Sequence, residues 1–163
     1  MAIGCFEVEW TKLFPSSDAE TQPEAERGGI YVKVIGRAKK IHYIGKSKEL
    51  SKRSKRHRQD DRRSGISTAR HYVSFGIVHS FKGKERVRSC TPKQLTDIES
   101  YLINTVKPKG NGASTMRGYK GNPLIVINTG KVLKPIQKIM TSNPELSKLI
   151  ATKSKKTPPS SWA

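Results

Sequence analysis

Two short apolar segments separated by four residues constrain the fold of this chain most. Residues 29–35 read Gly-Ile-Tyr-Val-Lys-Val-Ile and residues 40–44 read Lys-Ile-His-Tyr-Ile, so β-branched and aromatic side chains dominate both. Such side chains fit a pleated, half-buried surface. Strands joined by so short a link pair antiparallel, and we therefore expect a β-hairpin over residues 29–44.

Two further segments carry weaker patterns. Residues 48–58 form a candidate helix capped by Ser47, but Leu50 is its only large apolar residue. A helix of this composition cannot lie in a core by itself. Residues 72–78 form another apolar run, which is typical of a strand, and Gly76 within it is a candidate bulge.

The best-defined start signal in the chain predicts a second helix. Thr91 is the expected N-cap, Pro92 takes the first helical position, and Gln94 completes a capping box. Apolar residues then recur at helical spacing until the segment 108–112 ends the helix; they are Leu95, Ile98, Leu102 and Ile103. Residues 124–127, Leu-Ile-Val-Ile, are a candidate last strand.

The net charge restricts the function classes that fit the chain. Among 163 residues, 32 Lys and Arg oppose 13 Asp and Glu, which gives a formal charge of +19. Residues 1–26 hold six of the acids and one base, so residues 27–163 carry 31 basic and 7 acidic side chains. This excess disfavours a small-metabolite enzyme and favours DNA, RNA or an anionic membrane surface as partner.

Targeting and metal-cluster signals are absent from the sequence. No run of eighteen apolar residues occurs, and the first ten residues lack the basic and apolar regions of a signal peptide. We therefore expect a cytoplasmic protein that does not insert into a membrane. Cys5 and Cys90 have no spacing suited to zinc or an iron–sulfur centre, and we expect both to be reduced.

Three residues on the expected helices, Glu99 on one and the pair Arg53 and His57 on the other, carry candidate chemistry, and both cases have a structural alternative. Glu99 lies beside the apolar stripe of the second helix, where it is either a metal ligand or a carboxylate that reaches solvent or a lysine. Arg53 and His57 lie four residues apart on one face of the first helix. They either contact phosphate or belong to a solvated basic helix.

The two tyrosines of the expected hairpin are a third candidate. Tyr31 and Tyr43 each lie beside an isoleucine and a glycine. A strand tyrosine most often serves packing. Two of them on adjacent strands, with Lys46 close by in sequence, would alternatively place phenols near an attacking water.

The order of these features resembles that of a known family. Gly29-Ile30-Tyr31, followed after eleven residues by Tyr43-Ile44-Gly45, is similar to the pair of tripeptides that names the GIY-YIG nuclease superfamily. The similarity continues over residues 28–112 through Lys46-Ser47, Leu50, Arg53, His57, Glu99 and Pro108-Lys109-Gly110-Asn111. The resemblance implies an α+β fold with a small three-stranded antiparallel sheet flanked by helices.

The resemblance also divides the chain. A nuclease core is expected at residues 28–112, after an N-terminal arm or linker at residues 1–27. A basic extension follows at residues 113–163, and we expect about its last ten residues, which are basic and rich in Pro and Ser, to be flexible.

The resemblance implies a role for each matching residue. Glu99 would bind a single Mg²⁺, for which Mn²⁺ would substitute, and Tyr31 would be the general base or would position the attacking water. Tyr43 and Lys46 would lower the pKa of Tyr31 or contact the scissile phosphate. A phenol of ordinary pKa, about 10, is a poor base at neutral pH, so this role requires neighbouring cations to lower the pKa of Tyr31.

The remaining matching residues are assigned to charge stabilisation and structure. Arg53 would stabilise the transition state, and His57 would assist Tyr31 or bind phosphate. Gly29, Gly45 and Asn111 would be structural residues at the site, with Asn111 bonded to nearby backbone.

We therefore expect a stand-alone, Mg²⁺-dependent DNA endonuclease of restriction, mobile-element or defence type. It would act as a monomer or homodimer and need no small-molecule cofactor. Seven basic residues are candidates for nucleic-acid contacts: Lys52, Lys55, Arg56, Arg62, Arg63, Arg117 and Lys120. The alternatives are an RNA-cleaving nuclease or toxin, and a nucleic-acid-binding module without catalysis.

Overall fold

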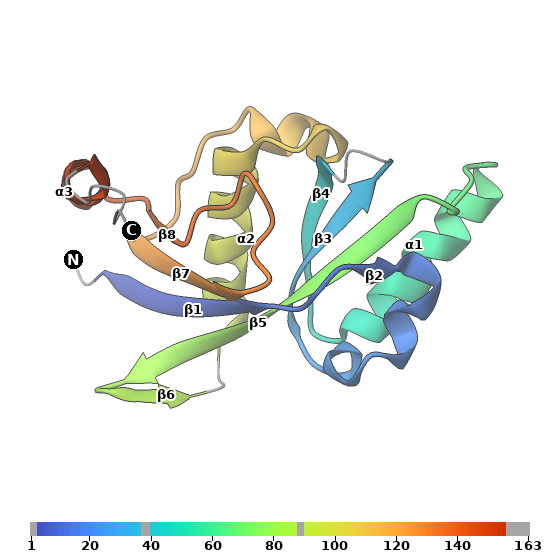
Figure 1. The fold of residues 1–163 in the computed structure, drawn as a ribbon, viewed down its shortest axis with the longest axis horizontal. Coiled ribbons are helices and arrows are strands. Elements are labelled where there is room, and N and C mark those ends of the chain that lie inside the picture. Colours follow the sequence, from blue (N-terminus) through green and yellow to red (C-terminus); the bar gives the residue numbers. More distant parts are fainter. Residues whose placement is uncertain (1–2, 37–39, 88–89, 156–163) are drawn as a thin grey trace, which may run out of the picture.

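The computed structural model describes residues 3–36, 40–87 and 90–155, which form a curled sheet with helices packed against it (Figure 1). The strands are β1 (Gly4–Trp10), β2 (Phe14–Pro15), β3 (Gly29–Ile35), β4 (Lys40–Ser47), β5 (His71–Lys82), β6 (Glu85–Val87), β7 (Leu124–Gly130) and β8 (Ile139–Thr141). The helices are α1 (Leu50–Arg63), α2 (Pro92–Val106) and α3 (Pro144–Lys155), with 3-10 helices η1 (Ser16–Thr21), η2 (Pro23–Glu26) and η3 (Lys109–Thr115).

The expected hairpin forms, and β5 extends it. β3 pairs antiparallel with β4 on one edge and with β5 on the other. Gly76 of β5 is no bulge, because it pairs in regular register with Ile30 on one side and Trp10 on the other. A Cβ atom at Gly76 would lie 2.6 Å from a methyl carbon of Val8, so glycine is required there for close packing rather than for a change of register.

The α+β class is confirmed, but the sheet is larger than the expected three-stranded one. It has eight strands in the order β4-β3-β5-β1-β7-β8, with β2 and β6 also paired to β5. β1 lies between β5, to which it is antiparallel, and β7, to which it is parallel.

The N-terminal segment, expected to be an arm or linker, thus supplies a central strand. Its apolar residues alternate, and Phe6, Val8 and Trp10 are buried on one face, in the cluster that also holds Ile98 and Leu102 of α2. Trp10 Nε1 donates a hydrogen bond to Asn128 Oδ1 of β7 at 2.9 Å.

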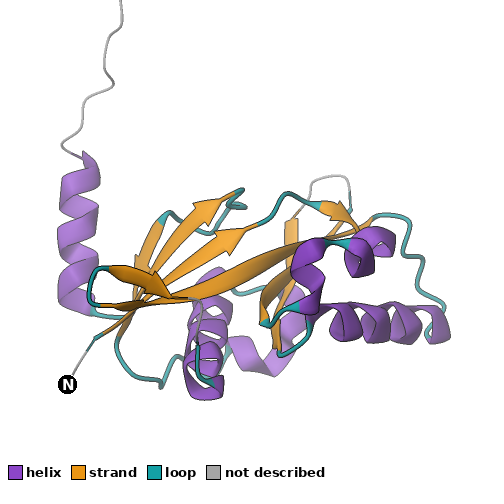
Figure 2. Cartoon of the chain, turned by 90° about the horizontal axis from the view of Figure 1, so that it is seen from below, coloured by secondary structure: helices purple, strands orange, loops and turns teal. Residues whose placement is uncertain are grey.

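Two helices pack on opposite faces of β3. Ile30 belongs to the same buried cluster as Ile98 of α2, whereas the next residue, Tyr31, belongs to a second cluster with Leu50 of α1. Successive strand residues point to opposite faces, so α2 covers one face of the hairpin and α1 the other. α3 stands beside β8, at the end of the molecule far from α1 (Figures 1 and 2).

The helix boundaries follow local hydrogen bonding. α2 begins as expected, with the Thr91 and Gln94 side chains each accepting from the backbone N–H of the other. α1 begins at Leu50 rather than residue 48, because the Ser47 hydroxyl accepts from the Glu49 N–H in a turn just before the helix. No helix within the described residues has the length and apolar content needed to cross a bilayer. The expected flexible end falls mostly on residues 156–163, which lie outside the described residues.

Candidate active site

Three predicted site residues meet in one hydrogen-bonded chain. Tyr31 reaches from β3 to α1, where Arg53 and His57 lie on consecutive turns of one helical face. Arg53 Nε donates to the Tyr31 hydroxyl oxygen at 3.1 Å, and His57 Nε2 lies 2.8 Å from the same oxygen. Tyr31 is only 4% exposed, so this contact is largely withdrawn from solvent.

Tyr43 joins this group from β4. Its ring stacks on that of Tyr31, with centroids 5.9 Å apart and planes at 30°, and it meets the His57 ring edge-on at 5.4 Å. In the ladder Tyr31 lies opposite Gly45, and Tyr43 lies opposite Lys33. Both phenols therefore leave the same face of the hairpin.

Lys46 and Glu99 form a second group at the outer edge of β4. Lys46 lies opposite Ile30 in the ladder, on the face that α2 covers. Its Nζ donates to Glu99 Oε2 at 2.5 Å, with 33% of the lysine and 16% of the glutamate side chain exposed. Tyr43 connects the two groups, because it packs on Tyr31 and His57 and also lines, with Glu99, a cavity of about 480 Å³.

This cavity also reaches the segment that follows α2. Its lining is mostly polar and comes from β4, α2, η3 and the loop beyond: Tyr43, Lys93, Asp97, Glu99, Ser100, Ile103, Asn104, Asn111, Ser114, Arg117, Gly118, Lys120 and Gly121. Of the seven predicted nucleic-acid contacts, Arg117 and Lys120 are therefore cavity residues. The other five are exposed on α1: Lys52, Lys55, Arg56, Arg62 and Arg63.

Gly29 and Gly45 permit close approach around Tyr31. A Cβ atom at Gly45 would lie 2.5 Å from both the Tyr31 hydroxyl oxygen and the ring carbon that carries it. A Cβ atom at Gly29 would lie 2.5 Å from the carbonyl oxygen of Gly76 in β5. Either side chain would displace the strand or phenol that it meets.

Asn111 ties η3 to β4 beside the cavity. Its Oδ1 accepts from the Ile44 N–H at 2.9 Å, and its Nδ2 donates to the Ile44 carbonyl at 2.8 Å. Among the described strands β4 is at the edge of the sheet, so the amide satisfies backbone groups that a further strand would otherwise bond.

Burial governs the protonation of the central pair. Burial raises the pKa of the Tyr31 phenol, and the hydrogen bond from Arg53 offsets this only in part. This differs from the expectation that neighbouring cations lower that pKa, since Lys46 is held by Glu99 on the other face of the hairpin. Burial, with the positive charges of Arg53 and Lys33, lowers the pKa of His57 from its ordinary 6.5, so its imidazole is uncharged at neutral pH.

These protonation states orient the hydrogen bonds. A guanidinium has only donors, so the Tyr31 oxygen accepts from Arg53. The phenol O–H then has the uncharged Nε2 of His57 as its acceptor, which assigns the ring proton to Nδ1. One lone pair of the phenol oxygen is left for a water molecule.

The donor set fits one divalent ion held jointly with substrate. No group of three or more His, Cys, Asp and Glu within the described part of the chain is arranged to hold a metal. Glu99 offers one carboxylate on a cavity with room for water and phosphate oxygens. Mg²⁺ is commonly bound in this way, through one or two carboxylates plus waters and phosphate.

An ion pair next to the site was not predicted. Lys33 Nζ pairs with the Asp61 carboxylate, and only 10% and 15% of the two side chains are exposed. Lys33 lies two residues after Tyr31 in β3, and Asp61 lies four residues after His57 in α1. These two spacings are the sequence signal that could have predicted the ion pair. However, a lysine in a strand and an aspartate in a basic helix are both typical of solvated positions.

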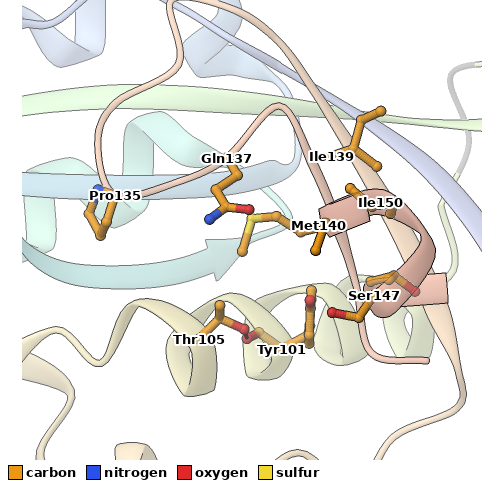
Figure 3. A pocket seen from close by; sticks show the side chains of 10 residues that line it. Tyr101, Thr105, Pro135, Gln137, Ile139, Met140, Ser147 and Ile150 are labelled. Carbon is orange, nitrogen blue, oxygen red and sulfur yellow. Dashed lines mark hydrogen bonds between the residues drawn. The ribbon is translucent and has the colours of Figure 1, made fainter. Parts of the chain in front are cut away.

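A larger cavity lies elsewhere, between α2, β8 and α3 (Figure 3). It measures about 730 Å³ and contains none of the predicted site residues. None of the residues that line it is charged, and its walls include Tyr101, Thr105, Met140 and Ile150. A phosphodiester needs cationic partners, so the smaller cavity beside Glu99 is the better candidate for catalysis.

Comparison with known protein families matches residues 27–113 to the GIY-YIG catalytic domain. Neither the curated proteins nor the solved structures gave a match. The matched segment runs from just before β3 into η3 and contains Tyr31, Tyr43 and Glu99 together with the α1 residues that contact Tyr31. Arg117 and Lys120, which complete the cavity, lie beyond it.

Proposed function

Because this chain belongs to the GIY-YIG family of nucleases, we propose that it is a Mg²⁺-dependent DNA endonuclease that hydrolyses phosphodiester bonds. The observation that supports this most is the hydrogen-bonded chain from Arg53 through Tyr31 to His57. Tyr43, which packs on Tyr31 and His57, connects this chain to the cavity that Glu99 lines. A module that only binds nucleic acid does not require a buried phenol bonded to an uncharged imidazole. Hydrolysis requires such a proton acceptor.

In this proposal Tyr31 and His57 act as one base. Tyr31 accepts a proton from the attacking water while its own proton passes to His57 Nε2, which leaves an imidazolium. The transfer avoids a free phenolate, which the burial of Tyr31 disfavours. Arg53, already fixed on Tyr31, stabilises the negative charge that develops on the phosphate.

Glu99 would hold the single Mg²⁺. Bound there, the ion supplies charge stabilisation at the phosphate oxygens. Lys46 would release the Glu99 carboxylate on metal binding, and its ammonium would then contact the phosphate. Mn²⁺ would substitute, because it takes the same oxygen ligands.

The basic residues would hold the substrate backbone. Arg117 and Lys120 line the cavity and would contact the strand that is cut, and the five exposed bases of α1 would contact flanking phosphates. In this proposal the nuclease has a restriction, mobile-element or defence role. A monomer would nick DNA, whereas a homodimer would cut both strands of a symmetric site.

Cleavage of supercoiled plasmid tests the proposal. We expect nicking or cutting by the wild type in Mg²⁺ that EDTA abolishes and that Glu99→Ala loses. Tyr31→Phe removes the transferable proton and should lower kcat by about 100-fold to 10,000-fold. Glu145→Gln removes an exposed carboxylate of α3 that pairs with Lys148, and should cleave like the wild type.

Plasmid binding without cleavage in either Mg²⁺ or Mn²⁺ would contradict the DNase assignment. The same variants would then be assayed on single-stranded and folded RNA. Cleavage there, lost in Glu99→Ala, would identify an RNA nuclease. No cleavage of any substrate would leave a binding module.

A further inference from the structure

A buried charged group lies directly beside the proposed base. Lys33 of β3 is paired with Asp61 of α1, and both side chains are mostly buried. The same Asp61 Oδ2 lies 3.3 Å from Nδ1 of His71, which begins β5 and is 4% exposed. No step of the proposed hydrolysis uses these three residues.

Their position repeats that of the catalytic pair. Lys33 follows Tyr31 by two residues, so both leave the same face of β3. Asp61 follows His57 by four residues, so both lie on the same side of α1. Tyr31–His57 and Lys33–Asp61 are therefore consecutive contacts between the same strand and the same helix.

Stability alone does not account for such a pair. Withdrawing two charges from water costs several kcal/mol per ion, and replacing a buried ion pair by apolar side chains is often neutral or stabilising. The Lys33–Asp61 contact lies one helical turn beyond the Tyr31–His57 contact. Together the two contacts restrain the rotation of α1 about its axis and its shift along β3. The Lys33–Asp61 pair also places one positive and one negative charge beside the imidazole.

We propose that Lys33 and Asp61 are positioning residues for the nuclease reaction: the pair holds His57 against the Tyr31 hydroxyl and places one positive and one negative charge beside its imidazole. The inference rests on the proposed function, in which His57 is the terminal base. It adds two residues that never touch the substrate.

Lys33 and Asp61 act on the pKa of His57 in opposite directions, so their effects can be separated. β3 contributes Tyr31 and Lys33, and β4 contributes Tyr43. α1 itself contributes Arg53, Asp60 and Asp61. Burial is the largest cause of the lowered His57 pKa; Arg53 and Lys33 lower it further, while Asp61 and Asp60 raise it. Replacing Lys33 should therefore raise the pKa of His57, and replacing Asp61 should lower it.

The experiment compares Lys33→Met with Asp61→Asn in the full chain. The His57 titration is followed by NMR of the imidazole nitrogens, assigned with His57→Gln, and the acid limb of kcat/KM is measured in parallel. We expect the midpoint to rise by about 0.5 to 1 pH unit in Lys33→Met and to fall by a similar amount in Asp61→Asn. Lys40→Met, which removes an exposed lysine of β4, should leave the midpoint in place.

Midpoints within about 0.2 pH unit of the wild type in both variants, or shifts in the same direction, would overturn the proposal. The NMR titration needs no substrate and therefore tests the pair separately from the nuclease function. If the His57 midpoint shifts in opposite directions in the two variants but the wild type cleaves nothing, the nuclease function is refuted and the effect of the pair on His57 is not. If neither single variant folds, Lys33→Met/Asp61→Leu removes both charges together. A kcat about tenfold lower with unchanged KM would then support a positioning role, and wild-type kcat would refute it.

Discussion

Gly45 shows how one missing side chain shapes the site. It lies opposite Tyr31 in the β3–β4 ladder, and a Cβ atom there would overlap the phenol. The Tyr31 ring has no free space to move into, because Tyr43 and His57 pack against it and Arg53 holds its oxygen.

Gly45→Ala should therefore lower kcat by about 100-fold while the chain stays folded. Lys40→Ala changes an exposed residue of the same strand and serves as the control. The measurement is single-turnover cleavage beside a thermal unfolding curve. Wild-type kcat in folded Gly45→Ala would show that the Tyr31 position is not critical.

The spacing of single residues predicted part of this geometry. Arg53 and His57, four residues apart, reach the same hydroxyl as the helical period requires. The protonation of Tyr31 was not predictable, because it depends on burial, which the sequence pattern does not report. The pairing of Lys33 with Asp61 was not predictable for the same reason, because the burial of Lys33 is not visible in the sequence pattern.

At the scale of elements, α2 carries Glu99 and begins with a complete capping box. Thr91 is exposed, so its replacement by alanine removes a cap without opening a cavity. We expect Thr91→Ala to lower the free energy of unfolding by about 1 kcal/mol, because the Gln94 N–H loses its acceptor.

Urea unfolding at fixed pH measures that loss, and Thr91→Ser, which keeps the hydroxyl, should recover most of it. Cleavage at saturating substrate should be unchanged, since Glu99 lies two turns beyond the cap. An unfolding midpoint equal to that of the wild type would mean that packing alone fixes the start of α2.

The difference between α2 and β1 explains which elements could be predicted. α2 is specified by its N-cap, Thr91, and by the apolar stripe within its own fifteen residues. β1 finds its partners far along the chain, since Trp10 pairs with Gly76 of β5 and Gly130 of β7. No local pattern identifies such partners, so the sequence pattern alone favours an arm or linker for residues 1–27.

Over the whole molecule, the acidic N-terminal segment neutralises part of the basic remainder. Glu20 of η1 pairs with Arg58 of α1, and Glu7 and Glu9 of β1 both pair with Arg86 of β6. The uneven charge along the sequence is thus partly cancelled in the fold. Lys52 of α1 also pairs with Glu49, but its side chain stays 79% exposed. The five exposed bases of α1 and the two in the cavity are accessible to a polyanion.

The free energy of unfolding should fall in mild acid because burial disfavours the charged form of two histidines, His57 and His71. Burial lowers the pKa of both His57 and His71 below the ordinary 6.5 of the unfolded chain, and nearby positive charges lower it further. Between those pKa values and 6.5 the unfolded chain binds more protons than the folded one. The stabilisation is therefore complete above pH 6.5 and is lost as the pH falls below it.

Urea unfolding curves between pH 7.5 and pH 5 would measure this loss. The free energy of unfolding should fall by up to about 1.4 kcal/mol per pH unit for each histidine. His71→Asn removes one titrating group and should flatten the decline, because the acid-induced proton uptake on unfolding is reduced. Lowering the pH should also weaken cleavage in the wild type, since a charged His57 cannot accept the Tyr31 proton. A midpoint that holds constant or rises down to pH 5 would show that neither histidine is held uncharged by the fold.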